Sequence, residues 1–241
     1  MPTRFYFHAA DTTVTGTLPT TEQNTALAPT RNVDAQTAKR SMNTTIGVGP
    51  HTNLSHNTIA STTTTAMFFT RFISDPLAAQ TIAAATWTLN FASSYSNASA
   101  NFPVSGGSQA IPITCYVWRP STGAKVGDIL NGNSTATFNE VAGPAVNQGT
   151  FSGSAVTCQA GDVLVLEVIF NTTQATATSR TVGFYFDGTT VNTTDDASVT
   201  NHASFLENPN TISFDFPSSI AMTEVVNKLV VLPRPMPVII T

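Results

Sequence analysis

The chain has four histidines, His8, His51, His56 and His202, which could bind a metal or act as general bases near neutral pH. His51 and His56 are five residues apart in a polar segment, with no cysteine or acidic residue at the spacing of a zinc site. His202 could meet a serine and an aspartate, but the sequence contains no Gly-x-Ser-x-Gly nucleophile turn. We therefore expect His51 and His56 to be exposed or interface residues, and we expect no metal site and no hydrolase.

Carboxylates on a β-sandwich could form a glycosidase site or a calcium-dependent sugar site. Asp187, Asp195, Asp196 and Glu207 lie in or near the segment 187–208. Their spacing alone does not bring them together and indicates a solvated loop. A polysaccharide-degrading enzyme would need two converging acids, which the sequence does not display, so we expect no enzymatic activity.

Glu167 is the unusual acid, because it stands inside the apolar run "VLVLEVIF" at 163–170. A carboxylate in a buried strand needs a cationic partner. We expect it to pair with an arginine on an adjacent strand, such as Arg71, Arg119 or Arg180, rather than to act as a general base.

Three aromatic residues, Trp87, Trp118 and Tyr185, could stack on a sugar, but core or interface positions explain them better. The glycine-rich stretch "SGGS" at 105–108 precedes a strand rather than a helix, so it does not predict a phosphate site. The sequence predicts no cofactor.

The composition indicates a protein that packs against neighbours. Only 10% of the 241 residues are charged, against about 25% in an average soluble domain. With a net charge of -4, copies of the chain repel one another weakly, and Thr, Asn, Ser and Ala must cover the surface. The ten Lys and Arg residues are scattered, so we expect no nucleic acid partner.

No apolar segment reaches the 18 to 20 residues of a membrane span, and no signal peptide is evident. We therefore expect synthesis in a cytoplasm and no membrane partner. In that reducing compartment Cys115 and Cys158, each within an expected strand, are predicted to be buried free thiols.

Residues 1–65 are predicted to form an extended N-terminal arm. From 9 to 65 the apolar residues are small and isolated, without a period of 2 or 3.6, so the segment cannot bury much surface by itself. We expect it to become ordered only against something else. Residues 3–7, "TRFYF", have the aromatic composition of a strand of the main domain.

Residues 66–218 are predicted to form the main domain, with strands separated by turn signals. Strands are expected in "AMFFTRFIS" (66–74, stopped by Asp75-Pro76), "TIAAATWTLNFAS" (81–93), "AIPITCYVWRP" (110–120), "AGDVLVLEVIFNTT" (160–173), "RTVGFYFDG" (180–188) and "TISFDF" (211–216). The strand at 163–170 is apolar enough to be buried on both faces. Turn-linked strands without helices between them predict an all-β fold, an antiparallel β-sandwich resembling a jelly roll.

Residues 219–241 are predicted to form a proline-rich C-terminal tail. Its first part, 219–230, is the one helical candidate of note, and the prolines of "VLPRPMPVIIT" then favour an extended chain. A free apolar tail would be a sticky patch, so we expect it to dock on a neighbouring subunit. The predicted contact residues are Val226, Leu229, Val231, Leu232, Pro233, Pro235, Pro237, Val238 and Ile239.

Three stretches, "MPTRFYF" (1–7), "FTRFISDPLAAQTI" (69–82) and "AGDVLVLEVIFNTTQATATSRTVGFYF" (160–186), together resemble a group of structural proteins encoded by tailed bacteriophages. The resemblance covers 1–7 and, discontinuously, about 69–216. Members of that group end their domain with a "NPWIEF"-like segment, whereas this chain has "NPNTISFDF" and an additional tail from Pro217. The resemblance implies a non-enzymatic virion component with a jelly-roll-like sandwich, and it carries over no catalytic residue.

From these observations we expect a phage virion protein made in the host bacterial cytoplasm. Its expected role is a capsid decoration or cement protein that stabilises neighbouring subunits by exchanging arm and tail. Its partners would be major capsid or neck and tail proteins and further copies of itself, with a trimer as one form. The alternative is a neck, tail or fibre component, including a sandwich module that binds a glycan or receptor.

Overall fold

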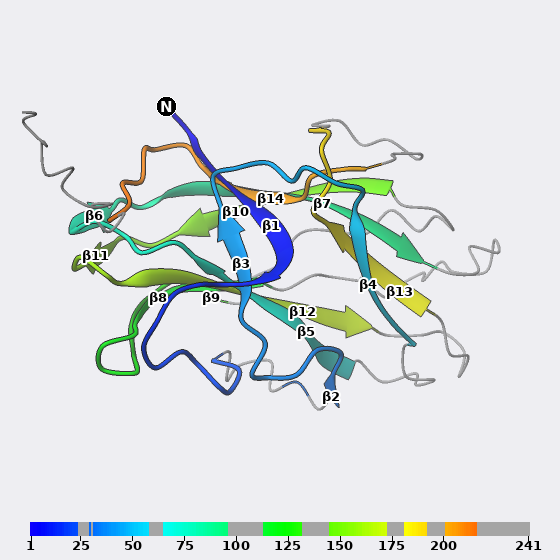
Figure 1. Ribbon diagram of the computed structural model, residues 1–241, viewed down its shortest axis with the longest axis horizontal. Coiled ribbons are helices and arrows are strands. Elements are labelled where there is room, and N and C mark those ends of the chain that lie inside the picture. The colour runs from blue at the N-terminus through cyan, green and yellow to red at the C-terminus, as the bar shows by residue number, and fades with distance from the viewer. Residues whose placement is uncertain are drawn as a thin grey trace, which may run out of the picture.

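The computed structural model describes residues 1–23, 29, 31–57, 65–95, 113–131, 145–172, 181–191 and 201–215. Every regular element in these ranges is a β-strand (Figure 1). The strands are β1 (Thr3–Asp11), β2 (Arg31–Asn32), β3 (Arg40–Asn43), β4 (Thr52–Asn57), β5 (Thr65–Ser74), β6 (Gln80–Ile82), β7 (Ala85–Tyr95), β8 (Ile113–Arg119), β9 (Ala124–Asn131), β10 (Ala145–Gly153), β11 (Val156–Cys158), β12 (Val163–Thr172), β13 (Thr181–Phe186) and β14 (Phe205–Asn208). The predicted all-β class is confirmed for this part of the chain.

Twelve strands form one sheet in the order β4-β13-β7-β14-β1-β3-β5-β12-β8-β9, with β10 beside β7 and β2 beside β5. The other two strands, β6 and β11, form a separate antiparallel pair. The sheet is mixed rather than purely antiparallel, because β2 and β3 run parallel to β5. Both parallel strands come from the segment predicted to be the N-terminal arm.

The main core collects side chains from strands far apart in this order. Phe5 of β1, Trp87 of β7 and Leu166 of β12 are fully buried in it. Phe184 of β13 lies among aromatic rings of several strands, with its centroid 5.7 Å from that of Phe91. The sheet therefore curves so that its separated parts share one core, which burial of apolar surface stabilises.

Apolar and polar residues alternate in the sequence around Trp87 and around Phe184, which predicts that the apolar ones share one face of each strand. Trp87, Leu89 and Phe91 are buried in the main core, and so are Phe184 and Phe186. The sequence also predicts that Ile111, Ile113, Cys115 and Val117 share one face; the last three, on β8, are buried in the main core, and Ile111 lies outside the described residues. Successive side chains of a strand point to opposite faces, so each of these sets lies on one face of its strand. The other face of β8 is buried too, at Tyr116 and Trp118.

The strand β12 is buried on both faces, as its apolar run predicted. Leu164 and Leu166 face the main core, while Val163 and Val165 belong to a second cluster with Ile73, Tyr116 and Trp118. Because this second cluster lies on the opposite side of β5, β12 and β8, some other segment has to cover it.

The covering segment comes from the predicted arm. Val14 and Leu18 pack on the second cluster, and β3 lies between β1 and β5 in the sheet. This arrangement differs from an arm that orders only against another molecule. The described parts of 9–65 order against their own chain through backbone hydrogen bonds, which leave no apolar period in the sequence.

The sequence placed a strand in "TISFDF", and this was wrong. Residues 211–215 make an isolated bridge between Phe214 and Leu77, and the last strand is instead β14, "FLEN", which pairs with β1 and β7. Four residues are too few to display an alternation. The alternation itself holds, because Ile212 faces the core while Ser213 is exposed. Phe216 and the whole segment 217–241, including the helical candidate 219–230, lie outside the described residues.

Candidate functional site

A buried ion pair joins β5 and β12 on their outer face, by which we mean the face that carries the second cluster and is turned away from the main core. Arg71 and Glu167 occupy opposite positions on the two strands, and both side chains are fully buried. Arg71 Nε and Nη2 donate to Glu167 Oε1 at 3.0 and 2.8 Å. The hydroxyl of Tyr116 on β8 donates to the same oxygen at 2.9 Å. The prediction that Glu167 pairs with an arginine such as Arg71 is confirmed.

Arg119, the second candidate arginine, binds a different acid. Arg119 forms a bidentate pair with Asp162, with Nε to Oδ1 and Nη2 to Oδ2 distances of 2.8 and 2.9 Å. This pair joins the end of β8 to the turn before β12. Arg180 lies outside the described residues.

Residues 12–23, which we call the strap, cross this outer face as an extended segment held by backbone groups. Arg71 Nη1 donates to the carbonyl of Pro19 at 2.7 Å and to that of Gln36. Arg71 Nη2 donates to the carbonyl of Thr21 at 2.7 Å. A guanidinium fixed by a carboxylate thus directs its remaining donors at four backbone carbonyls, the fourth being that of Ala38 at 3.5 Å.

The other end of the ion pair also binds the strap. The backbone N–H of Gln23 donates to Glu167 Oε2 at 2.9 Å, and the indole N–H of Trp118 donates to the carbonyl of Thr17 at 2.7 Å. The strap therefore supplies both donors and acceptors, while Val14 and Leu18 exclude water. Burial in this site, together with the charge of Glu167, raises the pKa of Tyr116 far above its ordinary value.

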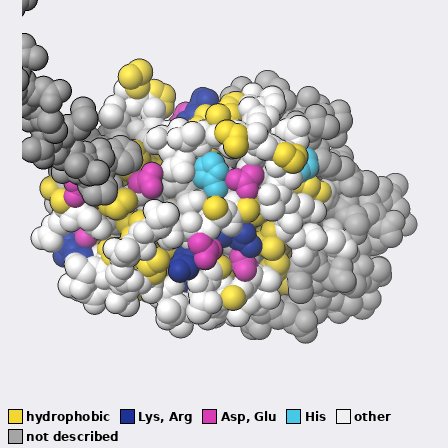
Figure 2. Space-filling view, viewed as in Figure 1, with side chains coloured by type: hydrophobic (Ala, Val, Ile, Leu, Met, Phe, Trp, Pro, Cys, Tyr) yellow, Lys and Arg dark blue, Asp and Glu magenta, His cyan; other side chains and the backbone are white. Residues whose placement is uncertain are grey.

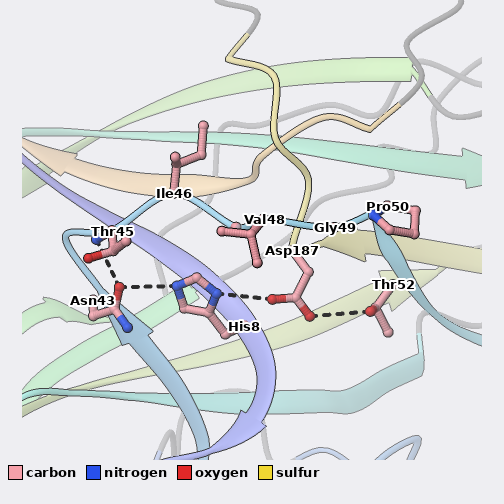
Figure 3. Close-up of a pocket in the computed structure, with 10 residues that line it drawn as sticks. His8, Asn43, Thr45, Ile46, Val48, Gly49, Pro50, Thr52 and Asp187 are labelled. Carbon is pink, nitrogen blue, oxygen red and sulfur yellow. Dashed lines mark hydrogen bonds and ion pairs between the residues drawn. The ribbon is translucent and has the colours of Figure 1, made fainter.

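A second cluster of polar side chains surrounds His8 at a pocket of about 390 Å³ (Figure 3). His8 Nδ1 lies 3.0 Å from Asp187 Oδ1, and Nε2 lies 3.1 Å from Asn43 Oδ1. The loop that carries Ile46 and Val48 arches over these groups in Figure 3. The arrangement has the residue types of a catalytic dyad or a small polar ligand site.

The polar groups on the floor of this pocket already bind one another. Asp187 Oδ2 accepts from the Ala9 N–H at 2.7 Å and from the Thr52 hydroxyl at 3.2 Å. Asn43 Oδ1 also accepts from the Thr45 N–H at 2.8 Å. Because both ring nitrogens of His8 and both oxygens of Asp187 are occupied, the cluster fits a structural tie between β1, β4 and the end of β13.

His202 is fully buried beside β7, and its Nε2 lies 2.6 Å from Asn90 Oδ1. Its Nδ1 and the Asn90 Nδ2 have no hydrogen-bond partner within the described structure. Burial, reinforced by nearby His51, lowers the pKa of His202 to about 4, so the ring is neutral at neutral pH. Ser204 binds the Ala92 N–H and the Tyr185 carbonyl.

His51 contacts two segments near this corner of the sheet. His51 Nδ1 accepts from the Asn201 N–H at 3.2 Å, and its ring packs edge-on against Tyr185 with centroids 4.6 Å apart. Burial lowers the pKa of His51. His56 lies in β4. No group of three His, Cys, Asp or Glu residues in the described part of the chain could hold a metal ion.

The structure does not bring the candidate carboxylates together where it describes them. Asp187 pairs with His8, whereas Glu207 of β14 pairs with Arg4 of β1. Asp195 and Asp196 lie outside the described residues.

Two of the three aromatic candidates, Trp87 and Trp118, are core residues and are 0% and 7% exposed. Tyr185 is half-buried, and its hydroxyl lies 2.9 Å from Ser94 Oγ. Cys115 and Cys158 are buried and free, which confirms the prediction of unpaired thiols. Burial raises the pKa of both, that of Cys158 to about 11. Neither thiol therefore has the ionised character of a nucleophile.

The surface is poor in charge, as the composition indicated. Figure 2 shows a face on which uncharged polar groups predominate and the few acidic and basic side chains lie close to one another. No helix among the described residues is long and apolar enough to cross a membrane. The predicted tail contacts, from Val226 to Ile239, lie outside the described part of the chain.

Neither the models of known protein families nor the curated proteins include a match to this chain. The sequence did not predict that Arg71, Glu167 and Trp118 bind the strap, because the backbone groups that they bind leave no pattern in the side chains. The one available signal was the charged Arg71 inside the apolar run "AMFFTRFIS", which pointed to a buried ion pair.

Proposed function

We propose that this protein is a non-enzymatic structural component of a bacteriophage virion, with the sandwich of jelly-roll type as its rigid body. The specific role we favour is a decoration or cement protein on the capsid. Its partners are then the major capsid protein or neck and tail proteins, and further copies of itself. The motif resemblance and the sparse surface charge support this proposal.

The observation that carries the proposal is the strap. This extended segment, whose one charged residue is Glu22, is fixed to a sheet face by four hydrogen bonds that Arg71, Glu167 and Trp118 make with its backbone. Since these bonds use backbone groups, the strap needs no particular side chains at its anchor points. Binding of extended segments to sheets is how cement proteins would link neighbours.

The strap binds to the sheet of its own chain, so it does not bind a neighbouring subunit. We therefore assign the contact between subunits to the tail 219–241. We propose that the apolar residues already named there, Val226, Leu229, Val231, Leu232, Pro233, Pro235, Pro237, Val238 and Ile239, insert against a neighbouring virion protein. Their burial at such a contact would contribute about 25 cal/mol for each Å² of apolar surface.

The test mixes purified full-length protein with particles assembled without it and separates the two by sedimentation. Saturable co-sedimentation is expected, and the double variant Val238→Asp/Ile239→Asp should lose it while keeping the wild-type circular dichroism spectrum. A control pair on the exposed side of β10, Gln148→Asp/Ser152→Asp, should bind like wild type. Wild-type protein that stays in the supernatant at every concentration would overturn the proposal.

The alternative, a fibre module that binds a glycan, would need an exposed aromatic ring beside free polar groups. Among the described residues Trp87 and Trp118 are buried, and the oxygens of Asp187 are occupied. No specific observation favours this alternative.

A further inference from the structure

Three segments that are far apart in the sequence meet where β4 begins and β13 ends. They are residues 47–51, 187–190 and 201–203, which we call the histidine corner because they include His51 and His202. A Cβ atom at Gly47 would lie 2.2 Å from the carbonyl oxygen of Asp187. One at Gly188 would lie 2.1 Å from the carbonyl oxygen of Asn201. The backbones of the three segments are therefore in close contact.

The hydrogen bonds of this corner are not part of a continuous ladder. Thr190 forms an isolated bridge with His202. The Thr190 N–H donates to the carbonyl of Asn201 at 3.0 Å, and the Ala203 N–H donates to the carbonyl of Thr190 at 2.8 Å. The Asn201 N–H donates to His51 Nδ1 at 3.2 Å. Segments joined by isolated bonds can open while the sheet beside them stays folded.

Ser204 is the residue at which the corner joins the sheet. Its hydroxyl binds the Ala92 N–H of β7 and the Tyr185 carbonyl of β13. Its carbonyl accepts from the Phe7 N–H of β1 at 3.1 Å. The strand β14 begins at the next residue and pairs with β1 and β7. An opening of the corner would therefore end at Ser204.

Both histidines fit the closed corner only in their neutral form. His51 Nδ1 is the acceptor of the Asn201 N–H, so a proton on this nitrogen would place two donors against each other. Asn90 Oδ1 can only accept, so His202 Nε2, at 2.6 Å, carries the proton. The buried Nδ1 of His202 has no partner within the described structure that could accept from a second proton. Protonation thus removes a bond at one ring and buries an unpaired charge at the other.

The charged and titratable side chains around the two histidines are bound to other groups. Asp187 pairs with His8, and Glu207 of β14 pairs with Arg4. Tyr185 contacts His51 through its ring, and its hydroxyl lies 2.9 Å from that of Ser94. No carboxylate of the described residues therefore compensates a positive charge on either histidine. Two charged rings would also repel each other.

The pKa values of the two rings agree with this geometry. Burial lowers the pKa of His51, and burial together with His51 lowers the pKa of His202 from 6.5 to about 4. A lowered pKa stabilises the closed corner above the open-state pKa, and this contribution is lost as the pH falls toward the closed-state pKa. His202 alone should then favour opening by about 20-fold when the pH falls from about 7 to about 5.

We propose that the histidine corner is an acid-sensitive latch, in which proton uptake by His51 and His202 separates residues 201–203 from the two other segments while the sheet stays folded. At neutral pH both rings are neutral and the latch is closed. The latch is built from residues of one chain, so it does not depend on the proposed function.

The test measures amide hydrogen exchange of the full-length protein by NMR between about pH 7 and about pH 5, with each rate corrected for the pH dependence of exchange in an unfolded chain. The reporters are the amides of Thr190, Asn201 and Ala203, and the references are those of Thr17 and Val33, which make loop hydrogen bonds away from the corner. The protection of the reporters should fall by about 20-fold or more, and that of the references by less than about threefold.

Two variants identify the groups that take up the protons. His202→Gln keeps a side-chain donor for Asn90 and does not titrate, so most of the pH dependence of the reporters should disappear. The double variant His51→Gln/His202→Gln should show none. The ring signals of wild-type histidines keep the test valid if a variant does not fold, because the His202 ring should titrate together with the loss of reporter protection.

Three results would overturn the latch. Reporter protection that stays constant over the whole pH range would do so. An equal loss of protection at reporters and references would show unfolding of the whole domain instead of opening of the corner. A pH dependence that persists in the double variant, or a His202 ring that titrates apart from the loss of protection, would show that other groups take up the protons.

Discussion

Substitution of Glu167 by Gln should destabilise the fold strongly, although the two side chains have nearly the same shape. Glu167 is fully buried and accepts hydrogen bonds from Arg71, Tyr116 and Gln23. In the variant the charge of Arg71 remains buried without its counter-ion. The amide NH₂ would also face a donor, since both oxygens of the carboxylate are acceptors in the native site. Breaking a buried pair in this way typically costs about 3 to 5 kcal/mol.

The double variant Arg71→Met/Glu167→Met separates the charge effect from the strap. Because both charged side chains are removed, no unpaired charge is left buried, and its cost to the free energy of unfolding is avoided. The carbonyls of Pro19, Thr21 and Gln36 still lose their hydrogen-bond donor. Each buried carbonyl left without a partner costs about 1 to 3 kcal/mol. The double variant should therefore be less destabilised than the sum of the two single variants, with a coupling of at least about 1 kcal/mol.

Urea unfolding followed by tryptophan fluorescence measures these differences. Trp118 binds the strap carbonyl of Thr17, so its emission also reports strap detachment. The matched control is Asp128→Asn, which breaks the half-exposed pair with Lys125 and should change the free energy of unfolding by less than about 1 kcal/mol. The reasoning is refuted when Glu167→Gln costs no more than this control.

Three further predictions concern other parts of the fold. His202 takes up its proton near pH 6.5 when unfolded and only near about pH 4 when folded, so stability should fall by about 3 kcal/mol as the pH drops through this window. The variant His202→Gln should lose this part of the pH dependence in urea titrations at each pH. Gly47→Ala should lower the melting temperature by several degrees, because its Cβ would lie 2.2 Å from the carbonyl oxygen of Asp187. Ellman's reagent should leave Cys115 and Cys158 unmodified in native protein and should titrate both in urea, since both thiols are buried.

Much of the fold could be predicted because the pattern of apolar residues in a strand shows which of its faces are buried. The alternation around Trp87 and around Phe184 identified inward faces, and the apolar run of β12 identified a strand buried on both sides. The acid inside that run required a cation, which led to Arg71, Arg119 and Arg180 as candidates, and the structure shows Arg71 as the partner. In each case the signal is local and arises from side chains.

The remainder could not be predicted because it depends on backbone groups or on distant pairs. The strap binds through carbonyls at 17, 19 and 21, whose side chains carry no pattern. The tie between His8 and Asp187 joins residues 179 positions apart, and no spacing rule covers such a distance. The strand β14 is too short to display a period, and its place between β1 and β7 follows from the topology.

The most direct test of the central claim is electron microscopy of particles assembled without this protein, before and after its addition. We predict new density at symmetry-related positions over the shell, large enough for the all-β domain, with the tail 219–241 reaching a neighbouring subunit. Density confined to the tail axis or to fibres would contradict the cement role. Particles that gain no density would contradict a structural role in the virion altogether.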